Sequence, residues 1–220
     1  MKELSELRRV FSELERYIKR SGFSYYHALK LLDLLDREGA IGRSLASKYL
    51  KLGEGSSRNL MRKLRSLKLI EIDPVAGGIM LDRGRAIVEF WREIIFSSCS
   101  EGSDLIPWKY ICVHSISKFA EETILRDYVR NVIALRDEII RRGCSGALIL
   151  RVIEGDPMLL NTRGEPDYSI KGTDLGSKVL RTCESFCIVT GSEKDMNEAE
   201  ACMWNLIVDL INIMRSGVDS

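Results

Sequence analysis

Apolar residues recur at every third or fourth position near the start of the chain, with charged residues between them. These positions are Leu4, Leu7, Phe11, Leu14 and Ile18. The periodicity predicts an amphipathic helix within residues 1–22. The pattern spans about two and a half heptads, fewer than a coiled coil normally needs. We therefore expect this helix to pack on its own domain, with pairing to a second subunit as the alternative.

A helical pattern interrupted by one hairpin continues through residues 23–96. Helices are predicted at 24–38, 42–51, 56–67 and 83–96, and short strands at 70–73 and 79–82. Gly39 is expected to end the first of these helices, because glycine readily adopts the left-handed conformation that follows many helices. The order of three helices, a hairpin and a final helix indicates one small domain.

The composition changes after residue 96. Residues 97–108 begin with a run of small and polar side chains, which predicts a linker. Residues 109–220 then alternate between apolar runs and helical patterns, which indicates a second domain. We expect its strands at 109–115, 146–153, 158–160 and 185–190, and its helices at 118–142, 173–182 and 195–215. The fold class predicted for the whole chain is α+β.

The overall charge of +1 conceals an asymmetry between the two predicted domains. Residues 1–96 contain 19 Lys and Arg against 13 Asp and Glu, whereas residues 97–220 contain 14 against 19. The window 43–68 is the most basic part, with eight Lys and Arg and Glu54 as its acid. A basic first domain and an acidic second one indicate that the first domain meets a polyanion.

The basic window has the pattern of two helices joined by a tight turn. Gly53, Glu54 and Gly55 are expected to form that turn, with Ser56 or Ser57 capping the next helix. Leu60, Leu64 and Leu67 share one face and are expected in the core. Arginine pairs with guanine edges, asparagine with adenine, and serine or lysine with phosphate. We expect DNA contacts from the outward side chains and the basic flank, namely Arg43, Lys48, Ser56, Ser57, Arg58, Asn59, Arg62, Lys63 and Ser66.

Residues 23–96 resemble the winged helix-turn-helix regulators of archaea and bacteria. The resemblance rests on Leu64-x-x-Leu67-Lys68-Leu69-Ile70 before the hairpin and on Leu81-Asp82-Arg83-Gly84-Arg85 after it. It implies binding to double-stranded DNA by a recognition helix and a wing. The sequence departs from the family at the wing tip, because residues 73–78 contain no Lys or Arg. Arg83 and Arg85, just beyond the wing, are expected to contact phosphate instead.

The second domain has a β-α-β-β-α-β order, which resembles ferredoxin-like sensor domains attached to winged helices. It is also similar to an uncharacterised domain that follows winged helices in archaeal proteins. That similarity rests on the segment 141–147 before a strand and the segment 188–193 before the last helix. The resemblance implies a regulatory domain that senses a small-molecule effector or forms a homodimer.

Candidate chemistry is sparse along the chain. His27 and His114 are the two histidines, and neither has the spacing of a metal site or a catalytic group. We therefore expect no enzymatic activity, no cofactor and no metal. A polar loop and a strand-to-helix turn, which offers free N–H groups to an anion, are candidate effector contacts. Their residues are Asp156, Asn161, Arg163, Asp167, Gly191 and Ser192.

The six cysteines, at 99, 112, 144, 183, 187 and 202, form no metal-binding motif. Cys112 and Cys187 stand in apolar strand patterns, where cysteine is usually a small buried hydrophobic residue. We expect these two to be buried and unpaired, and a disulfide, which would be an exception in a thermophile's cytosol, remains the open alternative.

The N-terminus is strongly charged, so no signal peptide is expected. The most apolar stretch, residues 203–214, is too short and too polar to span a membrane. These features predict a cytoplasmic transcriptional regulator that binds duplex DNA. The alternatives are an adaptor whose winged helix docks on protein, and a nucleotide-handling enzyme with a winged-helix appendage.

Overall fold

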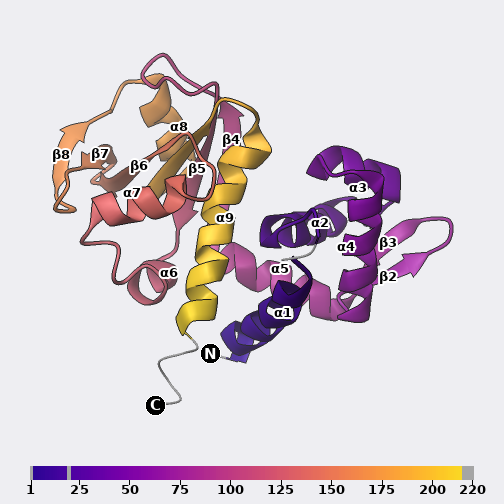
Figure 1. Cartoon of the computed structure of the whole chain (residues 1–220). Helices are drawn as coiled ribbons and strands as arrows, with labels where there is room; N and C mark the ends of the chain where they lie inside the picture. Colours follow the sequence, from indigo (N-terminus) through magenta and orange to yellow (C-terminus); the bar gives the residue numbers. More distant parts are fainter. Residues whose placement is uncertain (1, 19–20, 215–220) are drawn as a thin grey trace. The chain divides into compact units, whose positions relative to one another are not determined.

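The computed structural model describes residues 2–18 and 21–214 of the chain. The chain divides into two compact units, residues 1–92 and residues 93–220. Each unit combines helices with one antiparallel sheet, so the α+β class is confirmed. Figure 1 shows the elements of both units along the chain. No helix among the described residues is both long and apolar enough to cross a membrane.

Unit 1 follows the predicted order, with one additional strand. Its elements are α1 (Lys2–Ile18), α2 (Tyr25–Glu38), β1 (Ala40–Ile41), α3 (Arg43–Leu50), α4 (Glu54–Ser66), β2 (Ile70–Asp73), β3 (Gly77–Met80) and most of α5 (Asp82–Ile94). The sheet has the order β1-β3-β2, with every pair antiparallel. Strand β1 is too short to be recognised from its sequence, and it forms because Ala40 and Ile41 pair with Ile79 and Gly78.

The N-terminal helix packs on its own unit, as expected. Leu7, Phe11 and Leu14 on α1 are almost completely buried. The Phe11 ring meets the rings of Tyr25 and Trp91 edge to face, with centroids 5.6 and 6.2 Å apart. Such edge-to-face contacts stabilise aromatic clusters beyond the burial of their area. Residues 19–20, near the expected end of this helix, lie outside the described residues.

The turn between α3 and α4 differs from the prediction. Helix α4 begins at Glu54, so Glu54 and Gly55 belong to its first turn and Gly53 precedes it with a φ of −63°. The left-handed residue of the turn is Lys51, with a φ of 52°. The carboxylate of Glu54 is favoured near the positive end of the helix dipole, which is consistent with this earlier start.

Unit 2 is a six-stranded antiparallel sheet in the order β4-β5-β9-β6-β7-β8. Its strands are β4 (Ile95–Glu101), β5 (Tyr110–Ile116), β6 (Gly146–Ile153), β7 (Asp156–Leu160), β8 (Pro166–Ser169) and β9 (Phe186–Ser192). Its helices are α6 (Lys118–Thr123), α7 (Val132–Ile140), α8 (Asp174–Thr182) and α9 (Met196–Ile213). Residue 215, the predicted end of the last helix, lies outside the described residues.

Helices cover both faces of this sheet. Leu175 and Val179 of α8 form a core with Ile111, Val113 and Val189 on one face. Helix α7 packs against β6, and α9 packs against β4, β5 and β9 (Figure 1). Because neighbouring side chains of a strand alternate between faces, Cys112, His114 and Thr190 point to the face opposite α8. Thr190 Oγ1 accordingly donates to the carbonyl of Ala199 on α9.

The ferredoxin-like arrangement predicted for unit 2 is wrong. In a ferredoxin-like sheet the first and third strands of the β-α-β-β-α-β unit are neighbours. Here the first strand, β5, lies between β4 and β9, and the third strand, β7, lies between β6 and β8. The four predicted strands are present in the expected order, but β4 and β8 were not predicted and the strand pairing differs, because local patterns do not specify which strands become neighbours.

The predicted linker and the predicted long helix also need correction. Residues 97–101, expected to begin a linker, belong to β4 and pair with β5 along their length. The helix expected at 118–142 is two helices, because residues 124–131 leave the helical path and Asn131 caps α7 by accepting the Ala134 N–H. A capping asparagine starts a new helix by satisfying one of its free donors.

The expectation that Cys112 and Cys187 are unpaired is wrong, and the open alternative of disulfides holds. Unit 2 contains three disulfides, Cys99–Cys112, Cys144–Cys202 and Cys183–Cys187. The first joins the directly paired residues of β4 and β5, the second joins the segment before β6 to α9, and the third joins the end of α8 to β9. Cysteine burial, on which the prediction rested, does not distinguish a free thiol from a disulfide.

His27 in α2 gives unit 1 a dependence on pH. Its Nδ1 accepts the Ser24 N–H over 2.9 Å at the start of the helix. Burial lowers the pKa of His27 from its ordinary 6.5 to about 4. The unfolded chain therefore takes up a proton at this residue in a pH range where the folded chain does not.

We expect the free energy of unfolding to fall by about 3 kcal/mol through His27 as the pH falls from 6.5 to 4. The stability that His27 contributes is complete above 6.5, its pKa in the unfolded chain. It is lost as the pH falls toward about 4, its pKa in the folded chain. His27→Gln removes the titration and offers an amide oxygen to Ser24. Urea unfolding of both proteins across this pH range measures the difference, and parallel pH profiles would refute the assignment.

Candidate nucleic-acid interface

Helix α4 has one buried face and one strongly basic face. Leu60, Met61 and Leu64 are buried at helical spacing, and they anchor the helix to the core of unit 1. The opposite face is exposed to solvent. Its exposed side chains are Glu54 in the first turn and, beyond it, Arg58, Asn59, Arg62, Arg65 and Ser66. The core leucines thus fix which side chains of α4 are available to a ligand.

A groove of about 410 Å³ lies between α4 and the β2–β3 hairpin. Four arginines line it: Arg43 from the first turn of α3, and Arg58, Arg62 and Arg65 from α4. Within residues 2–18 and 21–214, none of the four forms an ion pair with a carboxylate. Several cations along one groove without internal partners create a positive potential that attracts a polyanion.

The hairpin forms the other wall of the groove, to which it contributes one acidic group, Asp73. Asp73 Oδ1 accepts the N–H groups of Val75 and Ala76, both over 2.7 Å. These hydrogen bonds, first from Ala76 and then from Val75, hold the pKa of Asp73 below its ordinary value. The Asp73 carboxylate therefore stabilises the turn, and the side chain of Val75 at the tip is 96% exposed.

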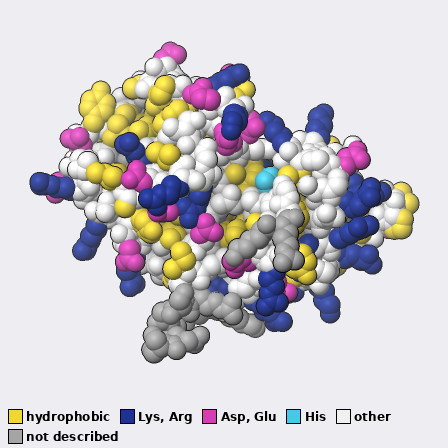
Figure 2. Space-filling model, in the orientation of Figure 1, with side chains coloured by type: hydrophobic (Ala, Val, Ile, Leu, Met, Phe, Trp, Pro, Cys, Tyr) yellow, Lys and Arg dark blue, Asp and Glu magenta, His cyan; other side chains and the backbone are white. Residues whose placement is uncertain are grey.

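Figure 2 shows the distribution of charge on one face of the molecule. Lys and Arg side chains gather over unit 1 next to the hairpin, and the hairpin tip itself is hydrophobic. The basic surface therefore belongs to the helices and not to the tip. This agrees with the absence of Lys and Arg from residues 73–78.

A second hollow, of about 530 Å³, lies on another side of α4, next to the end of α1. Among its described lining residues are Asn59, Arg62, Lys63 and Ser66 of α4. Arg62 lines both this hollow and the groove beside the hairpin. The exposed face of α4 is thus flanked by two concave basic surfaces that share Arg62.

Seven of the predicted DNA-contacting residues lie where a ligand on this face can reach them. Arg43, Arg58 and Arg62 line the groove, while Asn59, Lys63 and Ser66 line the hollow next to α1. Lys48 is exposed on α3. The sequence predicted these positions because helical periodicity separates the exposed face of α4 from its core face.

Ser57, which was predicted to contact DNA, is instead completely buried. It stands three residues before Leu60 and seven before Leu64, so it shares their core face. Ser56 is half-buried beside Gly22, where an added Cβ would lie 2.9 Å from its hydroxyl oxygen. Neither serine caps α4, because the residue before the helix is Gly53. We therefore remove Ser56 and Ser57 from the candidate interface.

Arg83 and Arg85 are engaged inside unit 1. Arg83 Nε donates to Glu6 Oε1 over 2.6 Å, and the same guanidinium donates to the carbonyl of Leu67. Arg85 pairs with Asp36 over 2.7 Å. Each of these two arginines therefore has a carboxylate partner on a distant helix, and the phosphate contact expected of them stays a prediction.

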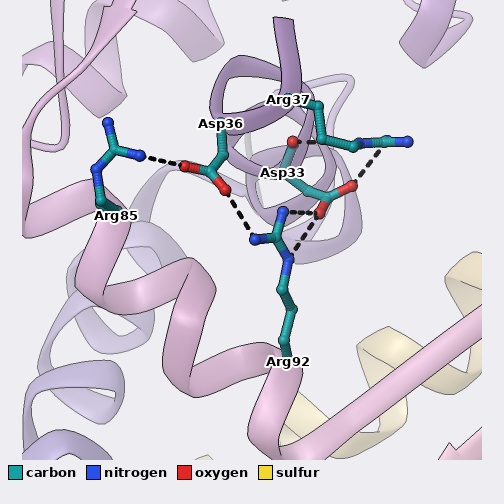
Figure 3. A network of polar contacts seen from close by, with 5 residues as sticks. All are labelled: Asp33, Asp36, Arg37, Arg85 and Arg92. Carbon is teal, nitrogen blue, oxygen red and sulfur yellow. Dashed lines mark hydrogen bonds and ion pairs between the residues drawn. The ribbon is translucent and has the colours of Figure 1, made fainter. Parts of the chain in front are cut away.

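Figure 3 shows the network that holds Arg85. Asp36 also accepts from Arg92 over 2.7 Å, and Arg92 pairs with Asp33 over 2.8 Å. Asp33 in turn pairs with Arg37 one helical turn further along α2. Burial lowers the pKa of Arg92, but the hydrogen bonds and charges of Asp33 and Asp36 outweigh it and leave the pKa raised. This network joins α2 to α5 and is structural.

The structure adds three residues that the sequence analysis did not select. Arg65 lines the groove together with Arg58. The two arginines are seven residues apart, so they lie on the same face of α4. That spacing was visible in the sequence. Arg16 and Tyr17, on α1, line the second hollow. Nothing in the local sequence indicates that the end of α1 meets α4.

The two candidate effector segments of unit 2, the polar loop and the turn at Gly191 and Ser192, lie apart from each other. Gly191 pairs with Gly146 at the start of β6, whereas Asp156 pairs with Ile153 at its end. These positions are about 23 Å apart along the strand, at the usual rise per residue. The loop and the turn therefore lie at different ends of the sheet and do not share one site.

The individual side chains of that prediction have structural roles as well. Asn161 Oδ1 accepts the backbone N–H groups of Arg163 and Glu165, which closes the loop between β7 and β8. Gly191 lies against Trp108, where an added Cβ would come within 2.0 Å of the ring. Ser192 is buried and donates to Glu198. Arg163 is exposed in the loop before β8, and Asp167 is exposed within β8.

Comparisons with known proteins address the fold alone. No family model matches the chain, and no curated protein matches it. The fold is similar to that of a solved structure, hypothetical protein PH0730 from Pyrococcus horikoshii OT3, with a TM-score of 0.58 and 21% sequence identity. The similarity covers 90% of this chain and 96% of that chain, so it extends through both units.

Proposed function

We propose that unit 1 is a winged helix-turn-helix domain that binds duplex DNA. In this interpretation α3 and α4 form the helix-turn-helix, α4 is the recognition helix, and the β2–β3 hairpin is the wing. The order α2-β1-α3-α4-β2-β3-α5 supports it. The hairpin also lies beside the exposed face of α4, as a wing does beside a recognition helix.

The observation that carries the proposal is the groove with four arginines, none of which forms an ion pair with the described residues 2–18 and 21–214. A recognition helix enters the major groove with its exposed side chains toward the base edges. Arg58 and Arg62 then lie where they can bind guanine edges or phosphate, and Asn59 where it can bind adenine. Arg43 and Lys48, on the preceding helix, are placed to bind phosphate and to fix the docking orientation.

The absence of Lys and Arg from the hairpin tip distinguishes this domain from winged helices with a basic wing. Val75 is exposed and Asp73 is acidic, so the tip adds no attraction for phosphate. The binding energy in our proposal therefore comes from α3 and α4. An exposed apolar tip also supports the second candidate function, a winged helix that docks on another protein.

We further propose that the whole chain is a transcriptional regulator in which unit 2 forms a homodimer or responds to an effector. A twofold dimer would place two recognition helices about one helical turn of DNA apart. Native mass spectrometry of the full chain measures its mass and any retained small molecule. A dimeric mass supports the first role, and a monomer with no bound molecule contradicts both.

Selection of bound sequences from a random duplex pool tests DNA binding by the full chain. We expect enrichment of a short motif, repeated as an inverted pair if the protein binds as a dimer. Arg58→Ala should change the enriched motif if that side chain reads a base. Recovery of no enriched duplex at low salt would contradict the proposal and favour the protein-docking alternative.

A further inference from the structure

The hollow next to α1 combines side chains from two helices that are distant in the sequence. Arg16, Tyr17, Ser21 and Phe23 contribute from the end of α1 and the segment after it. The other wall is α4, with Asn59, Arg62, Lys63 and Ser66. The described lining residues therefore include three cations and no carboxylate. Because its charged side chains are all positive, the hollow is suited to bind an anion. An anion bound there would lie beside the exposed face of α4.

Tyr17 and Lys63 connect the two walls. The Lys63 ammonium lies 3.6 Å from the centroid of the Tyr17 ring. An ammonium over the face of a tyrosine is attracted by the ring electrons and loses some of its conformational freedom. Tyr17 remains 49% exposed, so the pair lies at the surface of the hollow. The contact holds a positive charge in place without neutralising it, as a carboxylate would.

Arg16 differs from the other exposed arginine on its helix. Arg9 pairs with Glu13 on the next turn of α1. Arg16 forms no ion pair within the part of the chain that the structure describes. It is exposed and lines the hollow. Of these two cations, Arg16 is therefore the one available to an external anion.

The position of the hollow indicates which anion it binds. A helix in the major groove has a phosphate backbone along each of its two sides. The hairpin groove, with Arg43 and Arg65, occupies one side of α4, and the hollow with Arg16 and Lys63 occupies another. We propose that the end of α1 is a second DNA-binding element, in which Arg16 and the Tyr17-held Lys63 bind the phosphate backbone flanking the site that α4 reads. This inference rests on the proposed DNA-binding function.

Binding of the full chain to a mixed-sequence duplex over a series of salt concentrations tests this element. Arg16→Ala should weaken binding about tenfold and reduce the slope of log affinity against log salt by about one, because one phosphate contact is lost. Tyr17→Ala should weaken binding in the same way, whereas Tyr17→Phe retains the ring and should bind like the unaltered protein. The sequence preference should not change in any of these variants.

Arg9→Ala is the matched control, since it removes the same charge from the same helix outside the hollow. Thermal unfolding of each variant shows whether unit 1 remains folded. If Arg16→Ala and Arg9→Ala bind alike while the unaltered protein binds with a steep salt dependence, the α1 element is refuted and the α4 interface remains. If the unaltered protein shows no salt-dependent binding, the proposed function fails and this inference fails with it.

Discussion

Replacing Arg58 and Arg62 together with alanine is expected to weaken binding of the full chain to duplex DNA by about a hundredfold or more. Each side chain is exposed on α4, and both line the groove beside the hairpin. A direct contact from arginine to a base edge or a phosphate is worth about 1 to 3 kcal/mol, so two lost contacts combine to a loss of this size. Fluorescence anisotropy with a labelled duplex measures it.

The control for this double variant is Arg136→Ala, which removes an exposed arginine from α7 in unit 2. It should leave DNA affinity close to that of the unaltered protein. Because Arg58 and Arg62 form no ion pair within residues 2–18 and 21–214, their removal should also leave the unfolding temperature nearly unchanged. Equal affinities for the double variant and the control would show that α4 is not the DNA-binding surface.

Removing the Cys144–Cys202 disulfide is expected to lower the free energy of unfolding of unit 2 by about 4 kcal/mol. The bond closes a loop with a sequence separation of 58, and a cross-link over a long loop restricts the unfolded chain strongly. Cys144→Ala with Cys202→Ala tests this, with urea unfolding of the full chain as the measurement. Alanine avoids placing a new hydroxyl in the buried site.

The pair Cys183 and Cys187 provides the matched control, because it loses the same atoms from a loop with a separation of only 4. Its double alanine variant should lose about 2 kcal/mol. A reductant should destabilise the unaltered protein more than it destabilises either variant. An unfolding curve of the unaltered protein that does not respond to reductant would contradict the presence of these bonds.

Local patterns in the sequence predicted most helices and strands, and they failed where pairing between distant segments decides the structure. Residues 97–101 contain serines and a glutamate, which are typical of a loop, and they form β4 only because β5 offers a complementary edge. The disulfides and the order of strands in unit 2 depend on contacts of the same kind. Asn131, in contrast, was a local signal: its side chain starts α7, and it separates two helices that were predicted as one.

In the candidate interface, too, local spacing predicted some residues, whereas contacts between distant segments decided others. Arg58, Asn59 and Arg62 could be predicted, because the leucines of α4 determine its exposed face. Ser57 is buried, although a serine in a basic helix is typical of an exposed position. Its spacing from Leu60 places it on the core face of α4. Arg83 and Arg85 could not be assigned from the local sequence, because their carboxylate partners lie on α1 and α2.

Tyr17 illustrates what only the folded chain reveals. Its position in an amphipathic helix places it away from the core, but the sequence does not show that Lys63 lies over its ring. The residues of α1 and α4 that line this concave surface lie more than 40 positions apart in the chain. Packing of α1 on its own unit creates that surface next to α4.

The salt dependence of duplex binding by the unaltered full chain tests the central claim most directly. A protein that neutralises phosphates releases bound counterions, so its log affinity falls linearly with log salt with a slope of about −0.9 per phosphate contact. With the arginines of the groove and the cations of the α1 hollow engaged, we predict a slope between about −4 and −7. No binding at low salt, or an affinity that does not change with salt, would contradict the claim.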